Sequence, residues 1–222
     1  MNRRQFILTT AAGVALPTLG HSYILPSHYV VKQAQAALDA RRGLQVGLLG
    51  RMWTSKRPAV VEIGERWLFG PKTRLDVSGP EGQAAHWTSQ EAPTGHTALL
   101  PPPAVHFAIS GLFGTGNLSQ HLAGLGILAS PQALHLFNGE IAISMGADPA
   151  QLTLPQAWFH QETFLPLRLI FRSDRSTYDL HMTDWDTPIT QGKFPRKIQI
   201  RRDGRPLRQL TVSTMQQPQA KR

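Results

Sequence analysis

The fold is decided by the stretch "PQAWFHQETFLPLRLIFR", residues Pro155 to Arg172, which contains two short apolar runs on either side of residues 161–163. Successive side chains of a β-strand point to opposite faces, so the second run divides into two sets. One face carries Arg168, and the other is wholly apolar: Leu165, Leu167, Leu169 and Phe171. Pro166 cannot donate to a β-ladder and favours an edge or a bulged strand. The stretch therefore predicts two strands whose apolar face either packs as core or lines a cavity.

Two dipeptides predict tight turns on either side of this stretch. Asn138 and Gly139 stand between apolar runs in "ALHLFNGEIAISMG", and Asp203 and Gly204 do so in "KIQIRRDGRPLRQLTVS". Both central residues of a type I′ turn need a positive φ, which these residue pairs adopt readily. A further strand is expected within "STYDLHMTDW", residues 176–185. Strands that follow one another through tight turns indicate an antiparallel meander.

The preceding part of the chain predicts one helix and several short strands. Apolar residues recur at helical spacing from Ser27 to Arg42, with Ser27 as a possible N-cap and Gly43 as a stop. Segments bounded by Gly, Pro or polar residues are expected as strands: residues 44–53, 60–69, 73–77 and 83–89. A loop around Pro101 to Pro103 and a short helix within residues 118–128 are expected next. The fold class is therefore mainly β (α+β): a curved antiparallel sheet with a helix to cover it.

The first twenty residues predict export. Arg3 and Arg4 precede an uncharged, moderately apolar run that is too short for a stable membrane span. The arginine pair followed by Gln5, Phe6 and Ile7 resembles the bacterial twin-arginine signal. An ordinary Sec signal and an uncleaved N-terminal anchor are the alternatives. We expect residues 1–20 to be a signal peptide, residues 21–222 to form a single domain, and the protein to reside in the periplasm.

Amino-acid composition limits the kinds of binding site and of partner that are expected. The chain has no cysteine, which excludes disulfides and thiolate metal sites. Its 23 Lys+Arg and 14 Asp+Glu give a net charge of +9. In an exported protein the expected anionic partners are phospholipid head groups, cell-envelope polymers or acidic protein surfaces, and not nucleic acid.

No catalytic signature is present in the sequence. None of the nine histidines belongs to an H-x-H or H-E-x-x-H motif, although a discontinuous three-histidine site is kept as an alternative. Asp179, Asp184 and Asp186 lie near His181 and are interpreted as turn and surface groups. The segment "GLFGTGNLS", residues 111–119, lacks the lysine of a phosphate loop and is interpreted as a flexible loop. We therefore expect neither enzymatic activity nor a cofactor or metal.

Three spaced patterns carry a family resemblance. An aromatic strand and a Pro-x-x-Arg step are formed by Gly64, Trp67, Phe69, Pro71 and Arg74. A second aromatic strand and an apolar-Pro-x-Arg strand are formed by Trp158, Glu162, Pro166 and Arg168, and a closing strand contains Pro195 and Ile198. Over residues 27–215 the chain resembles the superfamily of LolA- and LolB-like periplasmic proteins, which includes the outer-membrane lipoprotein-sorting group.

The resemblance implies an open half-barrel closed on one side by helices, with an apolar concave face that binds a lipid or acylated ligand. The implied ligand-binding residues are Trp67, Phe69, Arg74, Trp87, Trp158, Phe164, Leu167 and Leu169. The family's carrier has a basic residue directly before the proline of the Pro-x-x-Arg step, whereas this chain has Gly70. This departure favours a distant relative with another cargo. The alternative function is a non-catalytic protein-interaction module of the cell envelope.

Overall fold

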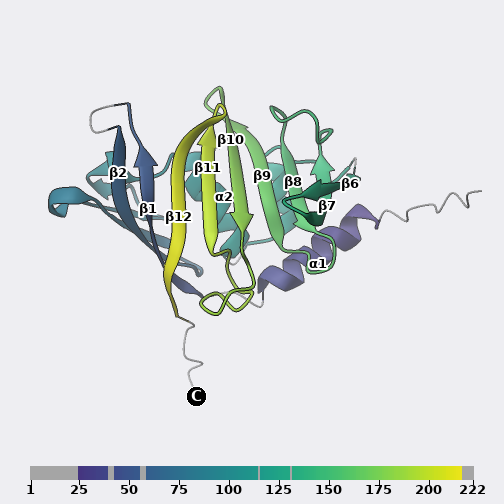
Figure 1. Ribbon diagram of the computed structural model, residues 1–222, viewed down its shortest axis with the longest axis horizontal. Helices are drawn as coiled ribbons and strands as arrows, with labels where there is room; N and C mark the ends of the chain where they lie inside the picture. The colour runs from purple at the N-terminus through teal and green to yellow at the C-terminus, as the bar shows by residue number, and fades with distance from the viewer. Residues whose placement is uncertain (1–24, 40–42, 56–58, 115, 131, 217–222) are drawn as a thin grey trace, which may run out of the picture.

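A computed structural model describes residues 25–39, 43–55, 59–114, 116–130 and 132–216. The expected signal peptide, residues 1–20, lies outside the described residues. The described chain forms one twelve-stranded antiparallel sheet, with strand order β5-β4-β3-β2-β1-β12-β11-β10-β9-β8-β7-β6, and three α-helices (Figure 1). This confirms the predicted fold class.

The sheet consists of two sequential meanders. The first contains β1 (Gln45–Trp53), β2 (Val60–Leu68), β3 (Arg74–Ser78), β4 (Ala84–Thr88) and β5 (Thr94–Gly95). The second contains β6 (Gln132–Phe137), β7 (Glu140–Gly146), β8 (Gln156–His160), β9 (Pro166–Ser173), β10 (Ser176–Thr183), β11 (Lys197–Arg202) and β12 (Arg205–Gln216). Pairing of β1 with β12, from Gln45 opposite Gln216 to Met52 opposite Arg208, joins the two meanders.

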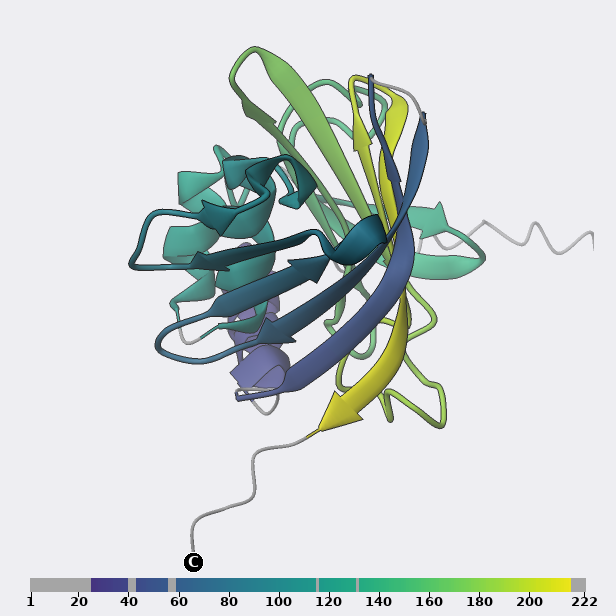
Figure 2. The ribbon, with the colours of Figure 1, turned by 90° about the vertical axis from the view of Figure 1, so that its left-hand side faces the viewer.

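The sheet curves around the helices α1 (Ser27–Asp39), α2 (Pro103–Phe113) and α3 (Leu118–Gly124), which lie on its concave side (Figure 2). Aromatic contacts fix α2 there, since the ring of Phe113 lies 5.3 Å from that of Phe69, which directly follows β2. Two short 3₁₀ turns, Pro80–Gly82 and Thr97–Leu99, lie at the same end of the sheet as the β1–β2 connection. The core therefore lies between the concave face and the helices.

The predicted turns are confirmed. Asn138 and Gly139 have φ values of 52° and 87° and lie between the paired residues Phe137 and Glu140. Asp203 and Gly204, with φ values of 50° and 76°, connect β11 to β12 in the same way. The β9–β10 turn was not recognised in the sequence because its central residues, Asp174 and Arg175, include no glycine although both have a positive φ.

The faces of β9 are also as predicted. Leu169 and Phe171 pair with the inward-facing Leu180 and Tyr178 of β10, whereas Arg168 lies on the opposite face. Pro166 is at a register shift between β8 and β9, so the bulged-strand alternative is correct and the edge-strand alternative is not.

Two expectations for the middle of the chain are wrong. The expected loop after Pro101 is short, because Pro103 is the first residue of α2. Proline is tolerated at that position since the first amide groups of a helix have no intrahelical acceptor. Residues 111–113, expected in a flexible loop, are the last residues of α2, and Leu118 and Ser119 begin α3. Asn117 caps α3 by accepting a hydrogen bond from the Gln120 amide at 3.1 Å.

Candidate functional site

The candidate site is a cavity of about 620 Å³ at one end of the concave face. It lies between the ends of β1 and β2, the beginning of β12 and the segment 96–102. We call it the mouth cavity. Most of its lining residues are apolar and the others are polar or charged: Met52, Trp53, Thr54, Ser55, Val61, Pro80, Glu81, Gln83, His96, Ala98, Leu99, Leu100, Pro102, Leu207 and Arg208.

A buried ion pair lies at the base of the mouth cavity, which its arginine, Arg208, lines. Arg208 of β12 and Glu65 of β2 are 2 % and 3 % exposed, and an Arg208 guanidinium nitrogen (Nη1) donates to Glu65 Oε1. The other carboxylate oxygen of Glu65 accepts from Trp67 Nε1 at 2.8 Å. Arg208 Nη2 donates to the Leu99 carbonyl oxygen and lies 3.4 Å from Met52 Sδ. The ion pair thus links the sheet to the segment that bounds the cavity.

Arg208 keeps one donor without a partner. Its Nε is buried and has no hydrogen-bond acceptor among the described residues. Burial lowers the pKa of Arg208, and the charge of Glu65 opposes that shift. The guanidinium therefore stays charged beside its carboxylate, and the base of the cavity is close to neutral overall.

His106 of α2 is a second buried polar group nearby. Its ring stacks on Trp87 with centroids 4.5 Å apart, and neither ring nitrogen has a partner among the described residues. Desolvation, and to a lesser degree the charge of Arg208, lowers the pKa of His106 to about 3. His106 is therefore neutral at pH 7 and adds no charge to this region.

Half of the predicted ligand-binding residues lie together in the core under the helices. Trp67 and Phe69 are stacked with centroids 5.5 Å apart, and both are at most 1 % exposed. Leu167 and Leu169 of β9 are also buried on the concave side. Trp87 is half-buried beside this group, 6.4 Å from Trp67.

The other three predicted residues lie apart from that group. Arg74 is exposed and donates from Nε to Asp76 at 2.8 Å. Trp158 is buried on the opposite face of the sheet. Phe164 lies in the β8–β9 turn with its ring 6.0 Å from that of Tyr29. None of the eight lines the mouth cavity, so their ligand-binding role stays a prediction.

Sequence reasoning missed Glu65, Arg208 and His106. A signal for the first two was present, because strand alternation places Glu65 in phase with Ile63 and Trp67. It likewise places Arg208 in phase with Leu210 and Val212. A charged residue on an apolar strand face is rarely buried unless it is paired. His106 gave no comparable signal, since it belongs to a helix that was not predicted.

A second polar cluster lies on the opposite face of the sheet. Arg168 donates to both carboxylate oxygens of Asp179, at 2.8 and 2.7 Å, and its guanidinium lies 5.0 Å from the centre of the Trp158 ring. Burial raises the pKa of Asp179, but Arg168 and His181 outweigh burial and bring it to about 2. The interpretation of Asp179 as a turn or surface group is therefore wrong, because it lies within β10 and anchors a buried arginine.

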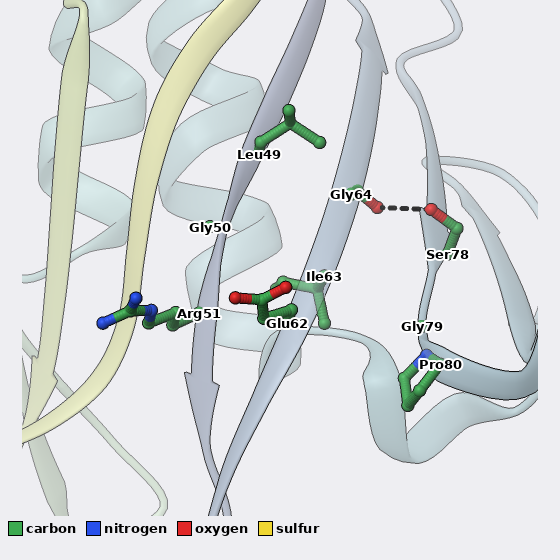
Figure 3. A pocket seen from close by; sticks show the side chains of 9 residues that line it. All are labelled: Leu49, Gly50, Arg51, Glu62, Ile63, Gly64, Ser78, Gly79 and Pro80. Carbon is green, nitrogen blue, oxygen red and sulfur yellow. Dashed lines mark hydrogen bonds between the residues drawn. The ribbon is translucent and has the colours of Figure 1, made fainter.

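The outer face also carries an open groove of about 560 Å³ (Figure 3). Gly64 and Leu49, which is 61 % exposed, are among the residues that line it. Arg51 and Glu62 are exposed at one end. The groove has no buried polar group comparable to Arg208, and for that reason we regard the mouth cavity as the candidate site.

Within the described residues, no group of three or more His, Asp or Glu side chains is arranged to hold a metal ion. None of the helices in that part of the chain has the length and apolar character needed to cross a membrane.

No protein-family model matches the chain, and no curated protein matches it. Similar solved structures include a LolA superfamily protein from Nitrosomonas europaea, which is 15 % identical with a TM-score of 0.53. That match covers 89 % of this chain and 96 % of the other. Another is a domain described as an outer membrane lipoprotein-sorting protein from Vibrio parahaemolyticus, 11 % identical with a TM-score of 0.50, covering 88 % and 95 %. At these identities the likeness shows the fold alone, an open curled sheet of the LolA type.

Proposed function

We propose that the protein is an exported, non-catalytic carrier that binds the acyl chain of a lipid or lipidated ligand in the mouth cavity. The observation that carries the proposal is an apolar cavity of about 620 Å³ at the open end of a LolA-like half-barrel. This volume lies within the range of roughly 300–1,000 Å³ that is usual for small-molecule sites.

The energetics of such binding are favourable. Burying ten methylene groups contributes roughly 8 kcal/mol at about 0.8 kcal/mol each, before the ordering costs of the chain. A net 8 kcal/mol corresponds to a dissociation constant of about 1 μM. An acyl chain longer than ten carbons buries further methylene groups, which offset the cost of ordering the chain. The resulting affinity is still weak enough for a carrier to release its ligand.

Export is part of this proposal and is supported by the arginine pair and apolar run of residues 1–20. Replacing both Arg3 and Arg4 with Lys is expected to block delivery to the periplasm by the twin-arginine route. Undiminished periplasmic protein would assign export to the Sec pathway.

Native mass spectrometry of the protein purified from its own host tests the carrier function directly. We expect adducts with the masses of acyl lipids. In a complementary titration with a fluorescent fatty-acid ester, Leu207→Asp in the cavity lining is expected to weaken binding at least tenfold. Leu49→Asp is the matched control, because Leu49 is exposed on the outer face of β1. No adduct and no probe binding by the wild type would refute the carrier function.

A second candidate function, a protein-interaction module, is favoured by β6. This strand is at one edge of the sheet, and three large apolar side chains of the β6–β7 hairpin are exposed: Leu134, Leu136 and Ile141. An exposed edge of this kind can pair with an extended segment of another protein. Co-purification of a stoichiometric polypeptide, which Leu136→Asp abolishes, would support this function.

A further inference from the structure

Five arginines gather at the tips of two neighbouring hairpins. Arg175 lies in the β9–β10 turn and Arg172 lies just before it, whereas Arg201, Arg202 and Arg205 flank the β11–β12 turn. All five side chains are exposed. The same two turns contain the carboxylates of Asp174 and Asp203. With five positive and two negative charges, this surface, which we call the arginine rim, has a net charge of +3.

The two hairpins are held side by side. The Asp203 amide donates to the Thr177 carbonyl oxygen at 2.8 Å, and the Thr177 amide donates to Asp203 Oδ1 at 2.8 Å. Arg202 Nε donates to Ser176 Oγ at 2.9 Å. Figure 1 shows both turns at the same end of the sheet. The arginines are thus brought together by hydrogen bonds between the turns.

Most of this charge is not neutralised within the protein. Arg202 has only a long ion-pair contact, with its Nε 3.8 Å from Asp203 Oδ2. In the part of the chain that the structure describes, Arg172, Arg175, Arg201 and Arg205 make no ion pair. The guanidinium groups are therefore available to an external anion.

The arginine rim adjoins the mouth cavity. A smaller cavity of about 160 Å³ is lined by Arg201 together with Trp53 and Arg208, and the last two also line the mouth cavity. On the other side, Arg172 lines a pocket with Phe107 of α2, whose side chain is 48 % exposed. An exposed aromatic ring, that of Phe107, thus lies beside the cationic groups.

We infer that the arginine rim docks the protein on an anionic phospholipid surface, with the mouth cavity opening toward the lipid. Guanidinium groups bind phosphate oxygens bidentately, and each basic residue near an anionic bilayer contributes about 1 kcal/mol. An exposed aromatic ring beside the charges fits the interfacial region of a bilayer better than it fits an acidic protein surface. Docking in this orientation would let an acyl chain pass between bilayer and cavity. Only that last consequence rests on the proposed carrier function.

The test is co-sedimentation of the purified protein, without added acyl ligand, with vesicles of phosphatidylglycerol and phosphatidylcholine or of phosphatidylcholine alone. We expect binding to the anionic vesicles only, weakening as salt rises because the attraction is screened. The double variant Arg172→Glu/Arg205→Glu should weaken binding about tenfold or more. Its matched control is Lys32→Glu/Lys72→Glu, which makes the same change of −4 in net charge at exposed positions away from the arginine rim and should bind nearly as the wild type does.

Equal losses in the two double variants would show that total charge alone governs binding, and would overturn the inference. A second contrary result is wild-type protein that binds neither kind of vesicle and is retained on immobilised poly-glutamate. That result would indicate an acidic polypeptide as the partner and would also overturn the inference. Titration of both variants with the fluorescent ester in solution separates the two proposals. We expect both to bind the ester normally, since neither substitution touches the mouth cavity.

Discussion

Arg208 of β12 and Glu65 of β2 form a buried ion pair although β1 lies between their strands. The long arginine side chain crosses β1 on the concave face, where it also contacts Met52 of that strand. The pair therefore connects three strands and, through the Leu99 carbonyl, the wall of the mouth cavity. Its removal should affect both the stability of the sheet and the shape of the cavity.

The ion pair gives the first prediction. Arg208→Met leaves the Glu65 carboxylate buried without its counter-ion, which is expected to lower the free energy of unfolding by about 3–5 kcal/mol. The double variant Glu65→Gln/Arg208→Met removes both charges and should recover most of the loss. Urea unfolding of the two variants measures the difference, with the exposed Arg66→Met as control. Equal destabilisation by the single and double variants would contradict the argument.

The second prediction concerns pH and His106. Its pKa is lowered to about 3 in the folded protein, below its ordinary value of 6.5. The unfolded chain therefore takes up the proton first as pH falls, so the stability from neutral His106 is present above pH 6.5 and is lost toward pH 3. The loss is about 1.4 kcal/mol per pH unit below 6.5, or roughly 2 kcal/mol at pH 5.

The variant His106→Phe keeps a ring against Trp87 and removes the titration. Urea unfolding at pH 8 and pH 5 should show a smaller decrease for this variant than for the wild type, by up to about 2 kcal/mol. His121, whose pKa burial lowers to about 4, changes stability in the same direction and is left in place in both proteins. Parallel decreases in the two proteins would mean that His106 is not the titrating group.

Turn geometry gives a third prediction. Gly139 has a φ of 87°, and a Cβ atom added at that position would meet no neighbouring atom within 4 Å. Gly139→Val should therefore destabilise the protein by about 1 kcal/mol or more, through backbone strain alone. Thermal or urea unfolding measures it, with the adjacent exposed residue in Glu140→Val as control. An unchanged midpoint for Gly139→Val would be inconsistent with a positive φ at this turn.

The fourth prediction concerns the charge of the ligand. Arg208 is already paired with Glu65 and His106 is neutral, so a carboxylate entering the mouth cavity would lack a counter-charge, whereas an ester carbonyl could accept from Arg208 Nε. Burying an unpaired charge is costly. Competition against a fluorescent ester at pH 8 should show methyl palmitate binding about tenfold or more tightly than palmitate. Tighter binding of the free acid would contradict this electrostatic argument while leaving the carrier function intact.

The strands and the Asn-Gly and Asp-Gly turns could be predicted because each depends on a local pattern. Helix α2 could not, since the side of the helix that is not buried carries no charged residue and so does not mark the helical period: Pro103, Ala104, Phe107, Ser110 and Gly111. The β9–β10 turn was also hidden, because Arg175 adopts a positive φ without being glycine. Tertiary packing overrides local preference at both places.

The candidate site was predicted less well than the fold. The aromatic residues of the strands led to the prediction that Trp67 and Trp158 bind the same ligand. In the structure these two residues lie on different faces of the sheet. The position of the mouth cavity depends instead on where segment 96–102 meets β12, a contact between residues about a hundred positions apart. No local pattern specifies such a contact.

The seam between β1 and β12 has a consequence for folding. Within each meander, neighbouring strands are also neighbours in sequence, so their pairing closes short loops. The seam joins residues 45–52 to residues 208–216 and closes a loop of the whole domain. Loop closure over such a separation is slow and cannot begin until the last strand has left the ribosome. Until β12 is available, β1 has one unpaired edge, which other extended segments can pair with in its place.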